Sequence, residues 1–170
     1  MLGVNTSGNY LSTKQTSMSN TYTQISIQSI FAVKGRQSII TPDWRYSLHS
    51  YIAGIINDEG AFSLAVGGWK DHVHAFFGLQ PTLSISEIMK KIKAGSSGWV
   101  NREGFIDGKF QWQSGYGAFS YSKSQRDSVI KYIINQEEHH SKESFRKEYL
   151  RMLDNFEVNY DEKYLFEFYE

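Results

Sequence analysis

Residues 70–78, Lys-Asp-His-Val-His-Ala-Phe-Phe-Gly (KDHVHAFFG), hold two of the five histidines of this 170-residue chain, one residue apart. The apolar run around them predicts a buried strand. Side chains two apart in a strand share a face, so His72 and His74 would stand side by side while Val73 enters the opposite layer. Such a pair is either two metal ligands or two polar residues on a half-exposed strand, because His-x-His alone is a weak metal signal.

The sequence around this strand alternates between strand and helix patterns. Thr41 and Pro42 suit a helix start, and Ser84 with Glu87 forms a capping box at the start of another helix. The predicted elements are, in order, a strand at 22–33, a helix at 41–60, strands at 61–69 and 72–79, a helix from 84 and a strand at 114–122. This β-α-β-β-α-β order predicts an α+β, ferredoxin-like (split βαβ) fold, an antiparallel sheet with helices on one face.

The length fits one domain, which we place at residues 21–170. Residues 1–20 read as a polar N-terminal extension that lacks the apolar region of a signal peptide. Helices are expected at about 124–139 and 144–155 after the sheet, and the aromatic tail at 164–170 suggests an edge strand.

Composition limits the classes of function. The absence of cysteine excludes disulfides, thiolate zinc sites and cysteine nucleophiles. No apolar run has the length of a membrane span, and we expect a cytoplasmic protein. The net charge is zero, but residues 1–136 carry +5 and residues 137–170 carry −5. A basic body with an acidic tail is compatible with nucleic acid on one face.

The helix expected at 124–139 carries a tyrosine away from its apolar stripe. Placing residues about 100° apart puts Tyr132 roughly 130° from the centre of that stripe, with Gln136 beside it on the polar flank. Taken alone, Tyr132 is most simply interpreted as a surface tyrosine that covers a neighbouring loop. Gln136 could supply an amide oxygen to a metal site only if this helix packs beside the histidine strand. The stripe itself consists of Val129, Ile130, Ile133 and Ile134.

The end of the same helix resembles a second metal cluster, since His139 and His140 follow Glu137 and Glu138. We interpret these residues as a charged helix end. Histidines there are favourably placed at the negative end of the helix dipole.

The motifs resemble one enzyme family. His72-Val73-His74 matches the His-hydrophobic-His motif of the HUH nucleases, and the run from Tyr132 to Gln136 matches the Tyr-x-x-x-Gln helix of their single-tyrosine branch. That branch comprises the single-strand DNA transposases of small bacterial insertion sequences and domesticated relatives acting at palindromic repeats. The resemblance covers about residues 22–155. The N-terminal extension, and Trp-Lys where many members carry Met-Pro before the Asp-His, depart from the pattern without touching a proposed ligand.

The resemblance implies a function and a site. Mg²⁺ or Mn²⁺ would be held by His72, His74 and Gln136, and Tyr132 would attack a DNA phosphate, expel a 3′-hydroxyl and keep the 5′-phosphate as a phosphotyrosine. No nucleotide cofactor is required, because the covalent bond stores the energy for rejoining. The implied partners are single-stranded DNA with hairpin ends and a second copy of the chain.

Residues that handle DNA are harder to identify from sequence. Basic candidates for phosphate contacts are Lys34, Arg36, Lys90, Lys91 and Lys93. Aromatic candidates for base stacking, of which at least two should be core residues, are Trp112, Tyr116, Phe119 and Tyr121. Two alternatives to the transposase stay open: a domesticated nuclease of palindromic repeats, and a catalytically silent nucleic-acid-binding module on a ferredoxin-like sheet.

Overall fold

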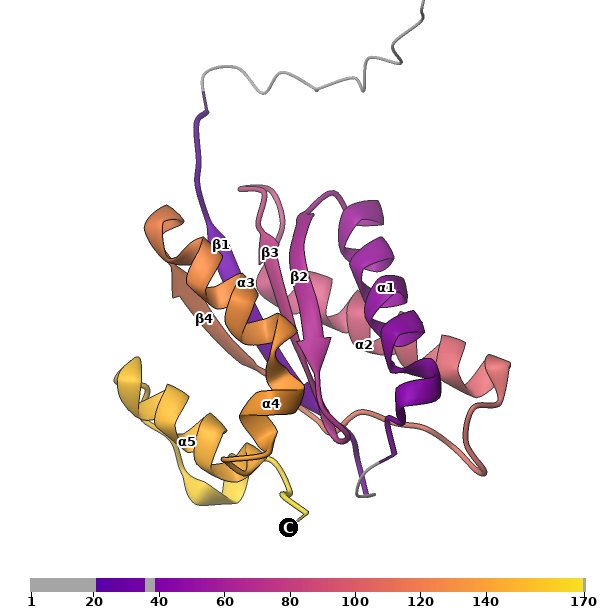
Figure 1. The fold of residues 1–170 in the computed structure, drawn as a ribbon. Coiled ribbons are helices and arrows are strands. Elements are labelled where there is room, and N and C mark those ends of the chain that lie inside the picture. The colour runs from indigo at the N-terminus through magenta and orange to yellow at the C-terminus, as the bar shows by residue number, and fades with distance from the viewer. Residues whose placement is uncertain (1–20, 36–38, 170) are drawn as a thin grey trace, which may run out of the picture.

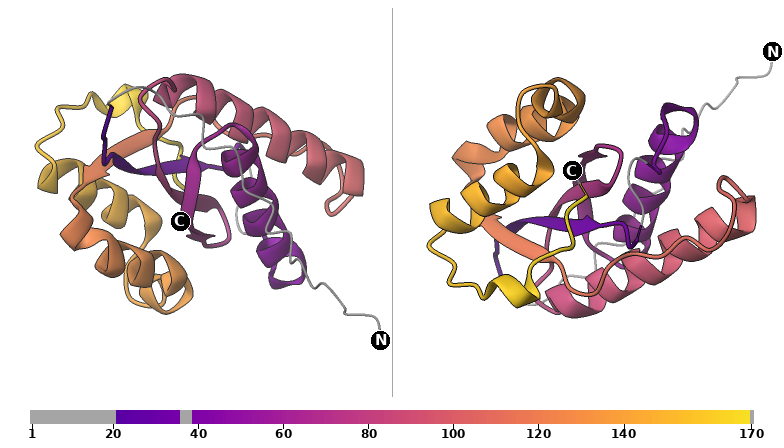
Figure 2. Two further views of the ribbon diagram at one scale, coloured as in Figure 1. Left: turned by 90° about the horizontal axis from the view of Figure 1, so that it is seen from above. Right: turned by 90° about the horizontal axis from the view of Figure 1, so that it is seen from below.

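The computed structural model of the protein describes residues 21–35 and 39–169. The predicted N-terminal extension and Arg36 therefore lie outside the described residues. Within those ranges a four-stranded sheet has helices on both faces, as Figure 1 shows from the side and Figure 2 from above and below.

The sheet is antiparallel and has the strand order β2-β3-β1-β4. The strands are β1 (Ser26–Ala32), β2 (Phe62–Gly68), β3 (His72–Gly78) and β4 (Gly117–Tyr121). The central strands are β1 and β3, and Ile30 is opposite His74 across them. With α1 (Pro42–Asp58) after β1 and α2 (Ile85–Glu103) after β3, the order is that of a split βαβ, so the predicted fold class is confirmed.

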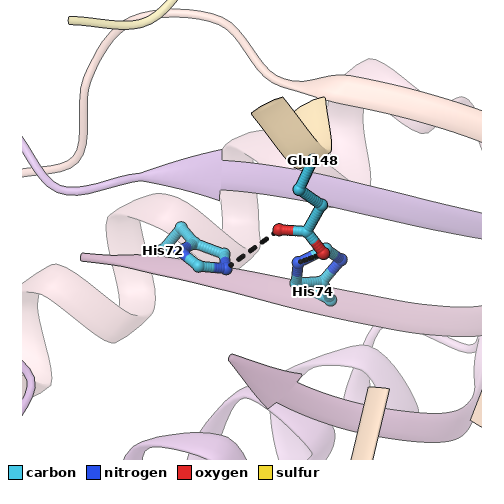
Figure 3. Close-up of side chains that lie close together, drawn as sticks. All are labelled: His72, His74 and Glu148. Carbon is cyan, nitrogen blue, oxygen red and sulfur yellow. Dashed lines mark ion pairs between the residues drawn. The ribbon is translucent and has the colours of Figure 1, made fainter. Parts of the chain in front are cut away.

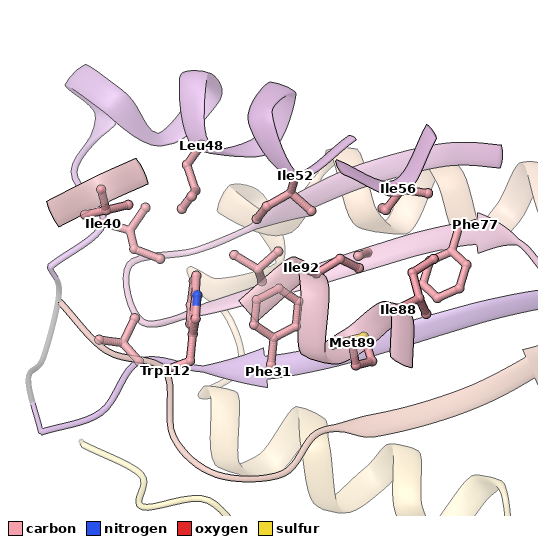
Figure 4. Packing of buried hydrophobic residues seen from close by; sticks show 14 of the residues in the cluster. Phe31, Ile40, Leu48, Ile52, Ile56, Phe77, Ile88, Met89, Ile92 and Trp112 are labelled. Atoms are coloured by element: carbon pink, nitrogen blue, oxygen red, sulfur yellow. The ribbon is translucent and has the colours of Figure 1, made fainter. Parts of the chain in front are cut away.

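One face of the sheet is covered by α1 and α2, which enclose the larger apolar core (Figure 2). Both helices begin where the sequence predicts: Pro42 stands in the first turn of α1, and the Ser84 side chain accepts a hydrogen bond from the backbone of Glu87. Alternate strand positions enter this core. Figure 4 shows its buried side chains, among them Phe31, Ile40, Leu48, Ile52, Ile56, Phe77, Ile88, Met89, Ile92 and Trp112.

The opposite face is covered by α3 (Arg126–Ile134), α4 (Gln136–His140) and α5 (Phe145–Asn155). The prediction of one continuous helix at 124–139 is wrong, because Asn135 separates α3 from α4 with a ψ of 22°. Asparagine leaves helical geometry readily, since its side chain competes for backbone hydrogen bonds. Ile134, which the sequence placed in the apolar stripe, is at the end of α3 and is 68% exposed.

The C-terminal region is partly as predicted. The helix expected at 144–155 is confirmed as α5, but the edge strand expected for the tail does not form. Instead, the backbone N–H of Glu167 donates to Oε1 of Gln113 at 2.7 Å, and its carbonyl accepts from Nε2 of the same side chain at 2.8 Å. The side-chain amide of Gln113 thus holds the tail by two hydrogen bonds to its backbone, where an edge strand would have paired backbone to backbone. A short 3₁₀ turn at Glu162–Tyr164 precedes this segment.

Candidate active site

The strand β3 places His72 and His74 on the face of the sheet that α3, α4 and α5 cover. Their rings lie 5.1 Å apart between centroids, and both side chains are fully buried. Val73 between them enters the apolar core on the other face, as the two-residue period predicts. Figure 3 shows the two imidazoles beside the carboxylate of Glu148, which α5 brings over the sheet.

Glu148 is a site residue that the sequence reading missed. Its buried carboxylate has Oε2 at 3.6 Å from His72 Nε2 and Oε1 at 3.4 Å from His74 Nε2. A signal was present in the sequence. Glu148 is three residues after Phe145 and four before Met152, so it lies on the apolar side of an amphipathic helix. A carboxylate on such a side has to find partners in the interior.

Gln136 and Tyr132 meet the same carboxylate. Gln136 is 1% exposed, its Nε2 donates to Glu148 Oε1 at 3.0 Å, and its Oε1 lies 3.3 Å from His72 Nε2. The hydroxyl of Tyr132 also donates to Glu148 Oε1, and its ring is edge-on to that of His74 with 5.9 Å between centroids. The proposed nucleophile and the three proposed ligands therefore lie around one carboxylate.

The interpretation of residues 137–140 as a charged helix end rather than metal-cluster residues is wrong for His140. Its Nε2 lies 2.9 Å from Gln136 Oε1, 3.0 Å from His72 Nε2 and 3.1 Å from Glu148 Oε2. His140 therefore belongs to the cluster. The spacing of four from Gln136, which puts both side chains on one side of α4, was the available signal.

Burial and neighbouring charges set the protonation states in the cluster. Burial raises the pKa of Glu148, but the nearby His74 and the hydrogen bond from His140 outweigh it and hold that pKa well below its usual range. Burial lowers the pKa of His140, yet its contacts with Glu148 more than compensate and raise it. Burial lowers the pKa of His74. Burial and the negative Glu148 raise the pKa of Tyr132, which keeps the phenol protonated at neutral pH.

Hydrogen bonds behind the rings decide which nitrogens face the centre as acceptors. His72 Nδ1 lies 2.7 Å from a carboxylate oxygen of Asp71, and His140 Nδ1 lies 2.9 Å from the carbonyl oxygen of Glu143. Both oxygens accept, so both Nδ1 atoms carry protons. When His140 is protonated, its Nε2 donates to Glu148; when the two rings are neutral, both Nε2 atoms present lone pairs. Gln136 Oε1 adds a third acceptor. Converging lone pairs beside a carboxylate need a cation, either a proton or a metal, so this donor set fits a divalent metal ion.

Two cavities border the cluster. One, of about 450 Å³, is lined by His140 and by three basic side chains, Lys70, Arg146 and Lys147. The other, of about 390 Å³, is lined by Tyr132 together with Arg151. The cluster is buried, but one cavity reaches its His140 and the other its Tyr132.

The lysines predicted to contact DNA lie elsewhere. Three belong to α2, on the opposite face of the sheet, and Lys34 is exposed after β1. Lys93 is half-buried, and its ammonium donates to the carbonyls of residues 113 and 115 at 2.6 and 2.7 Å, so its charge is already partnered. Its long stem lets the charge cross to that loop. The exposed candidates within the described residues are Lys34, Lys90 and Lys91.

A groove of about 690 Å³ runs between α2 and the segment 109–116. It is lined by three lysines, Lys90, Lys93 and Lys109. Of the aromatic residues considered for base stacking, Trp112 and Phe119 are core side chains, 8% and 3% exposed. Among the described residues, basic side chains thus line a concave region on each face of the sheet, and the one beside His140 also holds Asp71 and Glu143.

A ferredoxin-like sheet with a His-hydrophobic-His pair on a central strand, and with a tyrosine helix packed over that pair, defines the single-tyrosine class of HUH enzymes. The sequence profile of the family described as "Transposase IS200 like" matches residues 21–136, more than half of the chain. The chain belongs to this family of IS200-like transposases.

Two solved structures share the fold. A candidate transposase from Deinococcus radiodurans R1 is 21% identical, with a TM-score of 0.53, and the match covers 69% of this chain and 95% of that one. A REP-associated tyrosine transposase bound to a REP hairpin is 15% identical, with a TM-score of 0.53, and the match covers 84% and 90%. At these identities the likeness concerns the fold. A search of curated protein sequences gave no match.

No helix within residues 21–35 and 39–169 is both long enough and apolar enough to cross a membrane.

Proposed function

We propose that this protein cuts and rejoins single-stranded DNA at the ends of an insertion sequence through a 5′-phosphotyrosine intermediate. One observation carries the proposal: the hydroxyl of Tyr132 and the side chains of His72, His74 and Gln136 meet at Glu148 in a buried cluster rich in lone pairs. Residues 21–170 would act as one domain.

His72, His74 and Gln136 would hold Mg²⁺ or Mn²⁺, with Glu148 and His140 as further donors in reach. When bound, the cation would polarise a phosphate oxygen and offset the charge of Glu148, which otherwise keeps the phenol protonated. Imidazole, amide and carboxylate ligands together suit a first-row divalent ion such as Mn²⁺. The preference between the two ions is a matter for titration.

Tyr132 would be the nucleophile. Its oxygen forms a bond to phosphorus as the bond from phosphorus to the 3′-oxygen breaks, and the leaving 3′-oxygen takes the electron pair and a proton. The phenol proton is released to water, since the low pKa of Glu148 makes its carboxylate a hydrogen-bond acceptor that orients the hydroxyl rather than a base. Attack of another 3′-hydroxyl on the phosphotyrosine reverses these bond changes and joins the new strand, so no nucleotide cofactor is needed.

Single-stranded DNA with hairpin ends would be the substrate, and two copies of the chain would act together. Lys34, Arg36, Lys90, Lys91 and Lys93 stay as candidates for phosphate contacts, with Lys93 the weakest because its ammonium is already bonded to two carbonyls. The structural neighbour bound to a REP hairpin favours one second candidate function, cleavage at palindromic repeats without mobilisation.

The test is incubation of the purified chain with labelled single-stranded DNA from the flanks of its gene, with and without Mg²⁺ or Mn²⁺. A metal-dependent covalent adduct on denaturing gels is expected. Adduct formation with repeats but not with element ends would favour the palindrome nuclease. DNA binding without any adduct would favour the silent module and contradict the proposal. Light scattering at micromolar concentration would test the dimer, and a monomer would contradict it.

A further inference from the structure

The two histidines on β3 differ in what stands behind them. His72 is backed by the carboxylate of Asp71, which can only accept a hydrogen bond. His74 is backed by the amide of Gln28, a fully buried residue of β1 whose Nε2 lies 2.8 Å from His74 Nδ1. An amide nitrogen can only donate, so Nδ1 accepts, and the neutral ring carries its proton on Nε2. In that tautomer His74 offers no lone pair to a metal ion.

Gln28 is satisfied on one side only, because its Oε1 is buried and makes no hydrogen bond among the described residues. A rotation of the terminal amide by 180° exchanges oxygen and nitrogen. The oxygen would then accept from Nδ1–H of His74, and Nε2 of the ring would gain a lone pair. One amide atom stays unpaired in either orientation, so the local hydrogen bonds do not favour one of them. Whether a metal ion occupies the cluster would then decide the orientation of the Gln28 amide.

We propose that Gln28 is a positioning residue that sets the tautomer of His74, and that its amide reverses when the metal binds. This inference rests on the proposed function, since the metal is what requires the lone pair. The ring loses its Nε2 proton and gains one on Nδ1, so it stays neutral and releases no net proton. The metal-bound arrangement would then match that of His72 and Asp71, a histidine ligand whose outer nitrogen donates to an oxygen.

The surroundings of Gln28 explain why an amide rather than a carboxylate stands here. Its neighbours across the sheet are Phe76 on β3 and Phe119 on β4. A carboxylate between these rings would be a buried charge with one partner, which is costly. An amide is neutral and can serve either tautomer, whereas an acid would fix one.

The direct test is nitrogen-15 NMR of the full chain with labelled histidine, because long-range spectra report which ring nitrogen carries the proton. Without metal, His74 should be protonated on Nε2 and His72 on Nδ1. Saturation with diamagnetic Mg²⁺ should move the His74 proton to Nδ1 and leave His72 unchanged, which makes His72 an internal reference. The proposal is overturned if His74 is already Nδ1-protonated without metal, or if it stays Nε2-protonated at saturation.

Variants separate positioning from packing. Gln28→Met keeps the volume but removes both hydrogen-bonding atoms, and Mn²⁺ affinity by calorimetry should fall about 10- to 100-fold, the usual effect of losing such a partner. Gln28→Glu should hold His74 in the Nδ1 tautomer even without metal and keep at least the wild-type affinity. Ser29→Ala, on the same strand, is the matched control: it removes a buried hydroxyl that makes no hydrogen bond among the described residues, and it should change neither readout.

The outcomes distinguish this inference from the proposed function. Absence of any Mg²⁺ or Mn²⁺ binding to the wild type would overturn both. Normal metal binding with wild-type affinity in Gln28→Met would overturn the role of Gln28 alone. If Gln28→Glu fails to fold, Gln28→Met and the wild-type spectra decide.

Discussion

The two faces of the sheet use the same strands and bury opposite kinds of side chain. Toward α1 and α2, β1 and β3 send apolar residues such as Phe31, Val73 and Phe77 into one continuous core (Figure 4). Toward α3 and α5 the same strands send Gln28, His72 and His74, which lie between two smaller apolar clusters. Figure 3 shows the two histidines beside Glu148. One face holds the larger apolar core, and the other holds the proposed active site.

The difference follows from the interactions that hold each face. Apolar burial has no direction and tolerates changes of shape at a modest cost. In a buried polar cluster each donor and acceptor needs a hydrogen-bond partner. Removing one partner leaves the other group buried without a hydrogen bond, and that group's desolvation then lowers the stability of the fold. Substitutions on the face toward α1 and α2 should therefore change the free energy of unfolding and leave metal binding and DNA cleavage unchanged. Substitutions on the face toward α3 and α5 should change metal binding and cleavage first.

The largest effect, on DNA cleavage, is expected from Tyr132→Phe. This substitution removes the hydroxyl oxygen from the proposed active site and keeps the packing of the ring. The variant should bind Mn²⁺ and hairpin DNA but form no covalent protein–DNA adduct on denaturing gels, whatever the metal concentration. Wild-type levels of adduct in this variant would mean that another tyrosine is the nucleophile.

His72→Ala should come next, because it removes a proposed ligand. We expect Mn²⁺ affinity by calorimetry to fall more than about 100-fold, beyond the usual loss for an outer partner, and adduct formation to fall with it. Excess Mn²⁺ should partly restore cleavage, which it cannot do for Tyr132→Phe. Gln136→Ala should act in the same way but more weakly, since water can replace a neutral amide oxygen. An unchanged affinity in His72→Ala would remove this residue from the metal site.

On the apolar face, Ile92→Ala should show the reverse pattern. Ile92 is fully buried, so truncation should lower the free energy of unfolding by about 2–5 kcal/mol, measured by chemical denaturation. Metal affinity and adduct formation below the unfolding transition should stay at wild-type values. Lys91→Ala, at the exposed neighbouring position, is the control and should shift stability by less than about 0.5 kcal/mol. A metal affinity that falls with Ile92→Ala would show that the two faces are coupled.

The smallest effect at neutral pH is expected from His49→Leu, on α1. Burial, followed by the positive charge of Arg45, lowers the pKa of His49 from 6.5 to about 4. Below pH 6.5 the unfolded chain therefore binds a proton that the folded chain does not, and stability falls as the pH drops toward 4. The accumulated loss is about 3 kcal/mol at about 1.4 kcal/mol per pH unit.

Between pH 7 and pH 4, the free energy of unfolding of His49→Leu, measured by chemical denaturation, should fall by less than that of the wild type, because the contribution of His49 is absent. At pH 7 His49 is neutral, so the protonation term vanishes there. His74, whose pKa is also lowered, should leave a remaining slope in the variant. A pH dependence identical to that of the wild type would mean that His49 is accessible to protons in the folded state.

Some of this protein could be read from local sequence. The two-residue period predicted the common face of His72 and His74, and start signals such as Pro42 and the Ser84 cap located the first turns of the helices, because these signals involve neighbours within one element. The order of strand and helix patterns then left the ferredoxin-like sheet as the simplest arrangement. Tyr132 and Gln136 were identified through the family resemblance, since a tyrosine on a helix flank is ordinary by itself.

Only the tertiary structure decided the rest of the site. Gln28 is 46 residues from His74, and His140 is 68 from His72, so no periodicity within an element links them. The break at Asn135 and the seating of α5 bring His140 and Glu148 inside, and both depend on packing between elements. A local pattern tells which side of an element is apolar. Which side chains meet across two elements is decided by the free energy of the whole packed chain, where each buried polar group has to find its partner.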